Sequence, residues 1–257
     1  MWKNNFINTT TKGAAMSIIK LTDSVYYLPF DPEFDRPSLG YIIGANYGLV
    51  VDSGNSPAHY MEFCKQLQSA GFKEPDFCAI THWHWDHTFG MTAINKPIIA
   101  HTLTNQKLNE MKLWQWSEAA LDERVRDNIE IEFCALHMRK EYSDLSEIKV
   151  KLADICFDGS YTVELGNKEV QLIHVEASHC DDAVVVYIPD EKIVFLGDIY
   201  SEDYYNNMEV YPQKNKALLD FLCGLDFELG LHSHVIPQTK AEILEILQTM
   251  QMACEGL

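Results

Sequence analysis

The most informative stretch of this 257-residue chain is THWHWDH, residues 81–87. It places three histidines and one aspartate, His82, His84, Asp86 and His87, within six residues. A strand end followed by a tight turn can present residues i and i+2 on one side, so His82 and His84 can share a metal ion while Asp86 and His87 face a neighbouring position. Imidazole and carboxylate suit zinc, iron or manganese, and no thiolate cluster accompanies them. Because two tryptophans interleave with these residues, the pattern favours a metal site over a solvated polar cluster.

The segments around this motif carry strand and helix signals in a regular order. Short apolar runs read as strands, and in the first part of the chain they lie at 18–21, 25–28, 41–43, 48–51, 77–80 and 97–100. Ser56-Pro57 opens a helix that Gly71 ends. In the second part we expect hairpins over 161–175 and 183–196, a helix near 216–222, a strand near 227–231 and a final amphipathic helix from about Thr239.

Residues 102–150 differ from the rest of the chain. They lack β-branched runs and are rich in Leu, Glu, Lys, Met and Gln, which favours two or three helices packed on the main body. We see no internal repeat and no interdomain linker. We therefore expect a flexible leader at 1–16, and a single domain over 17–257 with a helical insert at about 102–150.

The motifs and their order resemble those of the metallo-β-lactamase superfamily. His82-x-His84-x-Asp86-His87 resembles its H-x-H-x-D-H signature, and the companions of that signature follow in the same order. They are Asp52 at an early strand end, His179 in Ser178-His179 as the third histidine, and Asp198 in Gly197-Asp198 as the bridging aspartate. The resemblance covers nearly the whole chain apart from residues 102–150.

The last histidine of the family pattern has two candidates, His232 and His234. In the family it precedes the final helix by about five residues, a spacing that favours His234. Ser233 and Val235 stand where the family commonly has glycine, so the local backbone is expected to differ. Cys180, next to His179, occupies a position that does not ligate in the family pattern.

The resemblance implies an α+β fold in which two sheets face each other with helices outside, a four-layer αβ/βα sandwich. It also implies two divalent metal ions per chain, with zinc as the first choice and iron or manganese as alternatives. The first ion would take His82, His84 and His179, the second would take Asp86, His87 and His234, and Asp198 would bridge them. Asp86 would in addition act as a catalytic residue that orients the nucleophile or shuttles a proton.

The expected activity is metal-dependent hydrolysis in which the two ions activate water against a small ester, thioester or lactone. Three alternatives stay open: a phosphodiesterase of the same fold, a di-iron redox enzyme, and a scaffold that binds without catalysis. The redox members usually carry a flavin domain and a carboxylate in place of one early histidine, whereas His84 is a histidine. Scaffolds generally lose ligands, whereas this chain has all seven.

Charge and cysteine content limit the partners and the location. The chain has 20 basic and 38 acidic residues, a net charge of −18, so we expect a small-molecule substrate and neither nucleic acid nor a membrane surface. Seven cysteines without a C-x-x-C pair are typical of a reduced, cytoplasmic protein. The insert, with Met111, Trp114 and Trp116, would form a lid with an apolar wall, and its exposed face could make a homodimer interface.

Overall fold

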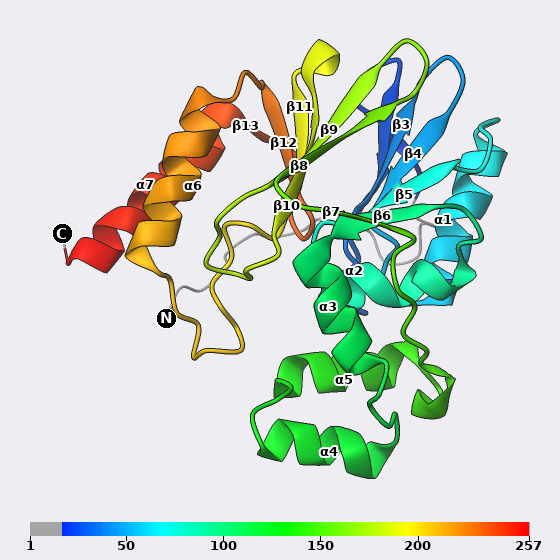
Figure 1. Cartoon of the computed structure of the whole chain (residues 1–257), viewed down its shortest axis with the longest axis vertical. Helices are drawn as coiled ribbons and strands as arrows, with labels where there is room; N and C mark the ends of the chain where they lie inside the picture. The colour runs from blue at the N-terminus through cyan, green and yellow to red at the C-terminus, as the bar shows by residue number, and fades with distance from the viewer. Residues whose placement is uncertain (1–16, 257) are drawn as a thin grey trace.

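The computed structural model describes residues 17–256, so the expected leader at 1–16 lies outside the described residues. Residues 19–157 contribute a seven-stranded sheet whose strands lie in sequence order (Figure 1). Its strands are β1 (Ile19–Lys20), β2 (Val25–Leu28), β3 (Leu39–Ile43), β4 (Gly48–Val51), β5 (Phe77–Ala79), β6 (Ile98–His101) and β7 (Ile155–Phe157). The pairs are antiparallel up to β4 and parallel from β4 to β7. Parallel pairing requires crossovers, and helix α1 (Pro57–Ser69) supplies the first of them.

The second half of the chain forms a six-stranded sheet in the order β13-β12-β11-β10-β9-β8. Its strands are β8 (Ser160–Glu164), β9 (Glu169–His174), β10 (Val184–Ile188), β11 (Ile193–Gly197), β12 (Leu229–His232) and β13 (Gln238–Thr239). Both predicted hairpins are confirmed as β8–β9 and β10–β11. Helix α6 (Pro212–Gly224) crosses between the parallel strands β11 and β12. The final helix α7 (Lys240–Glu255) starts at a capping box of Thr239 and Glu242.

Alternating side chains build three apolar layers, as the two-residue period of a strand requires. In β4, Val51 faces the second sheet, whereas Val50 faces outward toward α1. A third layer lies between the second sheet and helices α6 and α7. The molecule is therefore the predicted four-layer sandwich, with one helical layer outside each sheet (Figure 1).

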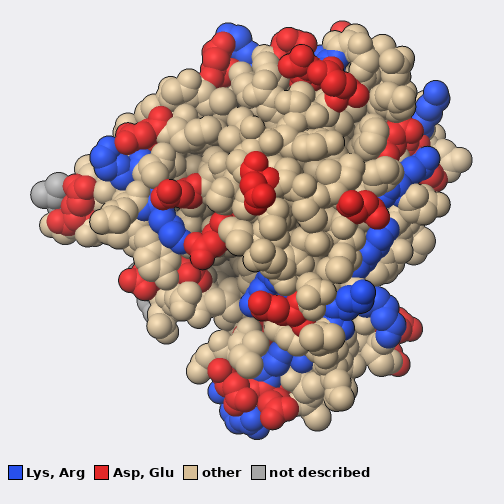
Figure 2. Space-filling view, in the orientation of Figure 1, with Lys and Arg blue, Asp and Glu red and all other residues tan. Residues whose placement is uncertain are grey.

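The expected helical insert contains three helices, α3 (Thr102–Met111), α4 (Glu118–Arg126) and α5 (Glu132–Glu141), followed by a 3-10 turn at Leu145–Glu147. Helices α4 and α5 project from one end of the molecule, where acidic and basic side chains lie close together (Figures 1 and 2). Arg139 of α5 contacts Glu118 at 2.7 Å and Asp122 of α4 at 2.6 Å. Such exposed ion pairs contribute up to about 1 kcal/mol each, so they help to join the two helices.

Strand β7 is the one strand of the first sheet that the sequence did not predict. It is three residues long, Ile155–Phe157, and it pairs parallel with β6 after the whole insert has intervened. A run of three residues is too short to show the two-residue alternation of a strand, and its pairing with β6 is what makes it one. Among residues 17–256, no helix has both the length and the apolar character that a membrane crossing requires.

Candidate metal centre

Loops at one edge of the two sheets bring all seven predicted ligands together. They come from four places in the chain: the β5–α2 segment with helix α2 (Trp85–Thr88), the loop after β9, the end of β11 and the turn after β12. The ligand atoms form two groups, and within each group they all lie within 4.8 Å of one another. The first group is His82, His84 and His179, and the second is Asp86, His87, Asp198 and His234. These are the two sets that the family pattern implied.

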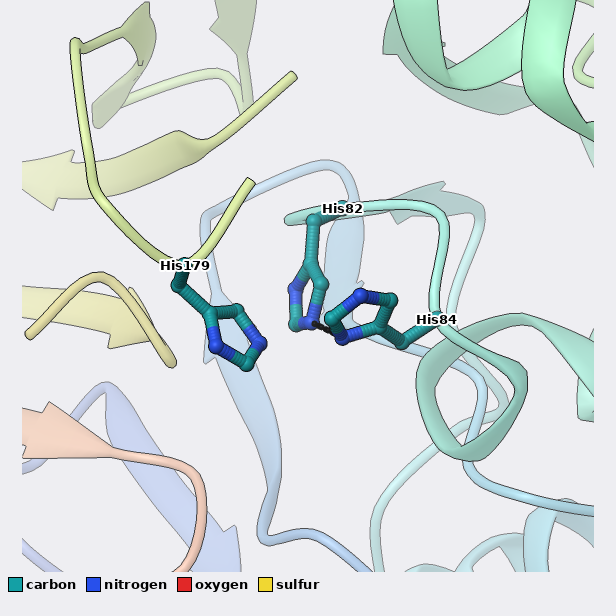
Figure 3. Close-up of side chains that lie close together, drawn as sticks. All are labelled: His82, His84 and His179. Atoms are coloured by element: carbon teal, nitrogen blue, oxygen red, sulfur yellow. Dashed lines mark hydrogen bonds between the residues drawn. The ribbon is translucent and has the colours of Figure 1, made fainter. Parts of the chain in front are cut away.

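The first group consists of three imidazole rings that converge on one point (Figure 3). His82 Nε2 lies 3.1 Å from His84 Nδ1, and the ring of His179 lies 4.5 Å from that of His84, centre to centre. His179 Nδ1 donates to the carbonyl oxygen of Glu202 at 3.0 Å, so its Nε2 carries the lone pair. That Nε2 is buried without a hydrogen-bond partner. An orphaned imidazole nitrogen beside two others fits a metal ligand.

The second group centres on the carboxylate of Asp86. Asp86 Oδ2 lies 3.1 Å from both His87 Nε2 and His234 Nε2. Asp198 Oδ2 lies 3.4 Å from the same His234 nitrogen. Two carboxylates and two imidazoles that face one another in a buried site are a donor set that suits a divalent cation.

Asp198 connects the two groups. Its Oδ2 lies 3.8 Å from His87 Nε2 in the second group and 3.8 Å from His179 Nε2 in the first. Its Oδ1 is buried without a hydrogen-bond partner, as expected for an atom placed to ligate. The preceding Gly197 has φ +55°, and a Cβ on it would lie 2.9 Å from the Cβ of Thr81. The turn that presents Asp198 therefore requires glycine.

Asp52 and Thr81 support the histidines from behind. Asp52 Oδ2 lies 2.8 Å from His87 Nδ1, and its Oδ1 accepts from the Thr81 backbone N–H at 2.8 Å. The Thr81 hydroxyl donates to Asp52 and lies 3.0 Å from His82 Nδ1. The contacts of Asp52 with His87 and of Thr81 with His82 engage the Nδ1 of each ring, which leaves its Nε2 available for a metal.

Burial and neighbouring charges set the protonation of the site. Burial lowers the pKa of His82 and His84 well below the usual value, so both rings are neutral, the form that binds metals. Burial by itself would raise the pKa of Asp198, but His234, His232 and His87 hold it well below its usual range. Although burial lowers them, neighbouring carboxylates raise the pKa of His87 well above its usual value and that of His234 to about 9, so a cation would displace a proton from each of these two rings. The ionised carboxylates, the two neutral rings and the orphaned atoms together fit two cations.

The geometry favours His234 over His232 as the seventh ligand. His232 uses both ring nitrogens elsewhere: Nε2 lies 3.1 Å from the Ser201 hydroxyl, and Nδ1 accepts from the His234 backbone N–H at 3.2 Å. The Ser233 N–H donates to the Gly197 carbonyl at 3.0 Å, which ties this turn to the one that presents Asp198. Cys180 belongs to neither group, and burial raises the pKa of its thiol well above the usual value.

Sequence reasoning missed the aromatic side chains that cover the first group. Tyr205 packs on Trp83 and His84, with ring centres 5.3 Å apart in both cases, and Tyr204 meets His179 edge-on at 5.4 Å. The Tyr205 hydroxyl donates to Glu130 of the insert at 2.8 Å. No local pattern marks the two tyrosines, because the contacts join segments far apart in the chain.

A cavity of about 400 Å³ adjoins His84 and His179. Its apolar walls come from Trp83, Leu103 of α3, Tyr205 and Tyr211, so the insert contributes one side of it. The expectation that Met111, Trp114 and Trp116 form this wall is wrong. Met111 is fully buried. The rings of Trp114 and Trp116 pack against the Arg124 guanidinium, at 4.9 and 4.6 Å from their centres, and do not line the cavity.

Tyr200 stands two residues after Asp198 in the chain and contacts the segment that follows β12. Its hydroxyl donates to Gln238 Oε1 at the start of β13. The ring stacks at a tilt against His232, with centres 4.3 Å apart. Tyr200 is therefore a support for the turn after β12.

Comparisons with known proteins agree with this geometry. A family model described as the metallo-beta-lactamase superfamily matches residues 34–202. A metallo-beta-lactamase from Pontibacter korlensis is 17% identical with a TM-score of 0.62, over 91% of this chain and 99% of its own. The DIM-1 metallo-beta-lactamase is 17% identical with a TM-score of 0.67, over 94% and 99%. The sec-alkyl sulfatase PisA1 is 11% identical with a TM-score of 0.67, over 92% and 41%. At such identities these structures show the shared fold alone.

Proposed function

This chain belongs to the metallo-β-lactamase superfamily, and we propose that it is a hydrolase that uses two divalent metal ions against a small ester, thioester or lactone. The observation that carries the proposal is the pair of buried ligand groups joined by the carboxylate of Asp198. Zinc is the proposed metal because the first group consists of three imidazoles and the second of two imidazoles and two carboxylates, with iron or manganese as alternatives. When bound, two such ions lower the pKa of water toward neutrality and polarise the bond to be cleaved.

The residues of the chain would supply positioning and proton transfer. Asp198 holds the two ligand groups at a defined separation. Asp86, between His87 and His234, would orient the attacking water and carry its proton to the leaving group. Tyr204 and Tyr205 cover the first group and exclude bulk water from it, which strengthens electrostatic interactions within the site.

The cavity beside the first group supports an apolar ester, thioester or lactone over a phosphodiester. Its volume of about 400 Å³ suits a small molecule, and Trp83, Leu103 and Tyr205 would contact an acyl group. The lining has two lysines, but Lys214 is already paired with Asp181 at 2.5 Å and Lys107 with Glu110 at 3.5 Å. Since three aspartates share this lining, it offers little net attraction to a phosphate.

The other two alternatives have less support. The first group contains three histidines and no carboxylate, whereas the redox members of the family replace an early histidine by a carboxylate. A scaffold without catalysis would not need to preserve seven converging ligands, several with buried unpartnered atoms.

The test is to purify the full chain without chelators, to measure metals per chain by elemental analysis, and to assay a panel of small esters, thioesters, lactones and a phosphodiester. We expect about two equivalents of zinc, iron or manganese, and hydrolysis that dipicolinate removes and added metal restores. Less than half an equivalent after metal supplementation, with no hydrolysis, would contradict the proposal. Activity on the phosphodiester alone would replace the proposed substrate class.

Removal of the Tyr205 hydroxyl is expected to weaken substrate binding. Tyr205→Phe loses the bond to Glu130, which is 3% exposed and whose buried carboxylate would keep the Ile131 N–H, 3.0 Å away, but lose its side-chain donor. We expect KM to rise about tenfold with little change in kcat, and the free energy of unfolding to fall by about 1–3 kcal/mol. Steady-state kinetics and thermal unfolding measure the two effects. The matched control is Tyr187→Phe, which removes a phenol bond to the Asp226 carbonyl away from the site; equal kinetics in both variants would refute a role for Tyr205 in binding.

A further inference from the structure

Each of the two histidines in the second ligand group has an aspartate behind it. Asp52 contacts His87 Nδ1 at 2.8 Å, as the family pattern implied. His234 directs its Nε2 toward Asp86, and its other nitrogen, Nδ1, lies 3.9 Å from Asp35 Oδ1. No sequence motif singled out Asp35, which is only 9% exposed.

We propose that Asp35 is a positioning residue that holds His234 for the second metal ion, an inference that rests on the proposed dinuclear site. A histidine that ligates a metal is usually oriented by a carboxylate or carbonyl at its other ring nitrogen, and loss of that partner typically weakens metal binding. The 3.9 Å contact is an ion-pair distance, about 1 Å longer than a hydrogen bond. His234 has the greater need of a partner, because its side chain is 25% exposed whereas that of His87 is fully buried.

The backbone at Asp35 is held in an unfavourable conformation. Asp35 has φ +53° and Asp52 has φ +62°, so both aspartates behind the second group lie in the left-handed region. This region costs a residue with a side chain about 1–2 kcal/mol, and such strain persists where the surroundings enforce it. The same strain at two positions with the same relation to a ligand histidine indicates that the fold maintains it for the site.

The surroundings of Asp35 enforce this conformation through the insert. Arg36 binds the carboxylate of Glu141 in α5 with two bonds, of 2.8 and 3.0 Å. The Glu141 side chain is 1% exposed and also accepts the hydroxyl of Ser56. Asn55, fully buried, donates to the carbonyl oxygen of Phe34 at 2.8 Å. A buried ion pair contributes little net stability compared with apolar packing, so its value lies in fixing the loop that carries Asp35.

Charge balance leads to the same role. Two divalent cations would bring four positive charges, of which Asp86 and Asp198 would offset two while the imidazole ligands stay neutral. Asp52 and Asp35 are the carboxylates directly behind the second group. In their ionised form these carboxylates would favour the second ion over the first, which has no carboxylate among its own three ligands.

The test measures metal affinity, so it does not depend on a known substrate. Chelator-treated full-length wild type, Asp35→Ala and the isosteric Asp35→Asn are titrated with Zn²⁺ against a chromophoric competitor, and with Co²⁺ followed by its visible spectrum. We expect Asp35→Ala to weaken the second equivalent by about 10- to 100-fold with the first unchanged, and Asp35→Asn to lie between. The control is Asp154→Asn, which removes a carboxylate bonded to the Ile98 N–H at the opposite edge of the first sheet.

The outcomes separate this inference from the proposed function. If the wild type binds two equivalents and both Asp35 variants bind them equally tightly with unchanged Co²⁺ spectra, the inference is wrong and the dinuclear site stands. If the wild type itself binds fewer than two equivalents, the proposed function fails. If Asp35→Ala also loses the first equivalent, Asp35→Asn decides, because asparagine keeps the shape of the side chain. Weaker binding of only the second equivalent by Asp35→Asn supports the inference. Equally weaker binding of both equivalents by Asp35→Asn overturns it.

Discussion

Replacement of Asp198 by alanine is expected to abolish binding of the second metal equivalent and to lower kcat/KM by at least about 10³-fold, or roughly 4 kcal/mol of transition-state stabilisation. The carboxylate approaches both ligand sets, at 3.8 Å from His179 and 3.4 Å from His234. In the proposed dinuclear site its loss would remove a ligand from each metal position and a negative charge from a buried site. Elemental analysis after gel filtration and steady-state kinetics on the best substrate of the panel measure the two effects.

The matched control for this variant is Asp226→Ala. Asp226 is also an aspartate in an ion pair, 3.3 Å from Lys192, but its side chain is 78% exposed and lies far from the ligands. We expect it to retain both equivalents and its activity within about twofold. An Asp198→Ala protein that keeps two metal ions and normal turnover would show that the bridging assignment is wrong. Thermal unfolding of both variants in their metal-free form shows whether a loss of metal comes from the missing ligand or from misfolding.

Replacement of Gly90 by alanine is expected to cost about 3 kcal/mol or more of the free energy of unfolding. A Cβ at this position would lie 1.9 Å from the Ser53 carbonyl oxygen and 2.8 Å from its carbon, both backbone atoms that cannot rotate away. The Gly90 N–H donates to the Gly54 carbonyl at 2.9 Å, and the Ser53 N–H donates to the His87 carbonyl at 3.0 Å. The turn after β4 and the helix with Asp86 and His87 therefore touch directly, and any separation displaces Asp52 from His87.

Gly224→Ala provides the comparison for this substitution. A Cβ on Gly224, at the end of α6, meets nothing within 4 Å. We expect its free energy of unfolding to stay the same or to rise by up to about 1 kcal/mol, because alanine restricts the unfolded chain. Urea denaturation with and without Zn²⁺ measures both variants. A Gly90→Ala protein as stable as Gly224→Ala would mean that the two segments can move apart without cost.

The helical insert has a larger part in the site than its position in the chain suggests. Through Glu130 it holds Tyr205 over the first ligand group, and through Glu141 it holds the loop with Asp35 next to the second. It also supplies Leu103 and Lys107 to the cavity. The insert thus makes two contacts with the loops around the metal centre, and its action as a lid stays a prediction.

Local patterns in the sequence determined most of the framework. Short apolar runs predicted β2 and β4 with their observed bounds, and Ser56-Pro57 marked the start of α1. The motif at 81–87 and the strand ends before His179 and Asp198 located the candidate ligands. A residue that follows a predicted strand lies at the edge of the sheet, so predicting the strand also places the ligand. The spacing of His234 from the final helix likewise pointed to the ring that joins the second group.

The tertiary structure alone decided the contacts that tune the site. Asp35 and Tyr205 act through partners more than 70 residues away, with 105 residues between Arg36 and Glu141 and 75 between Tyr205 and Glu130. Strand β7 exists because β6 offers it a free edge across the insert. Such pairs leave no period and no motif in the sequence, because their energy arises only after the sheets have formed and brought the segments together.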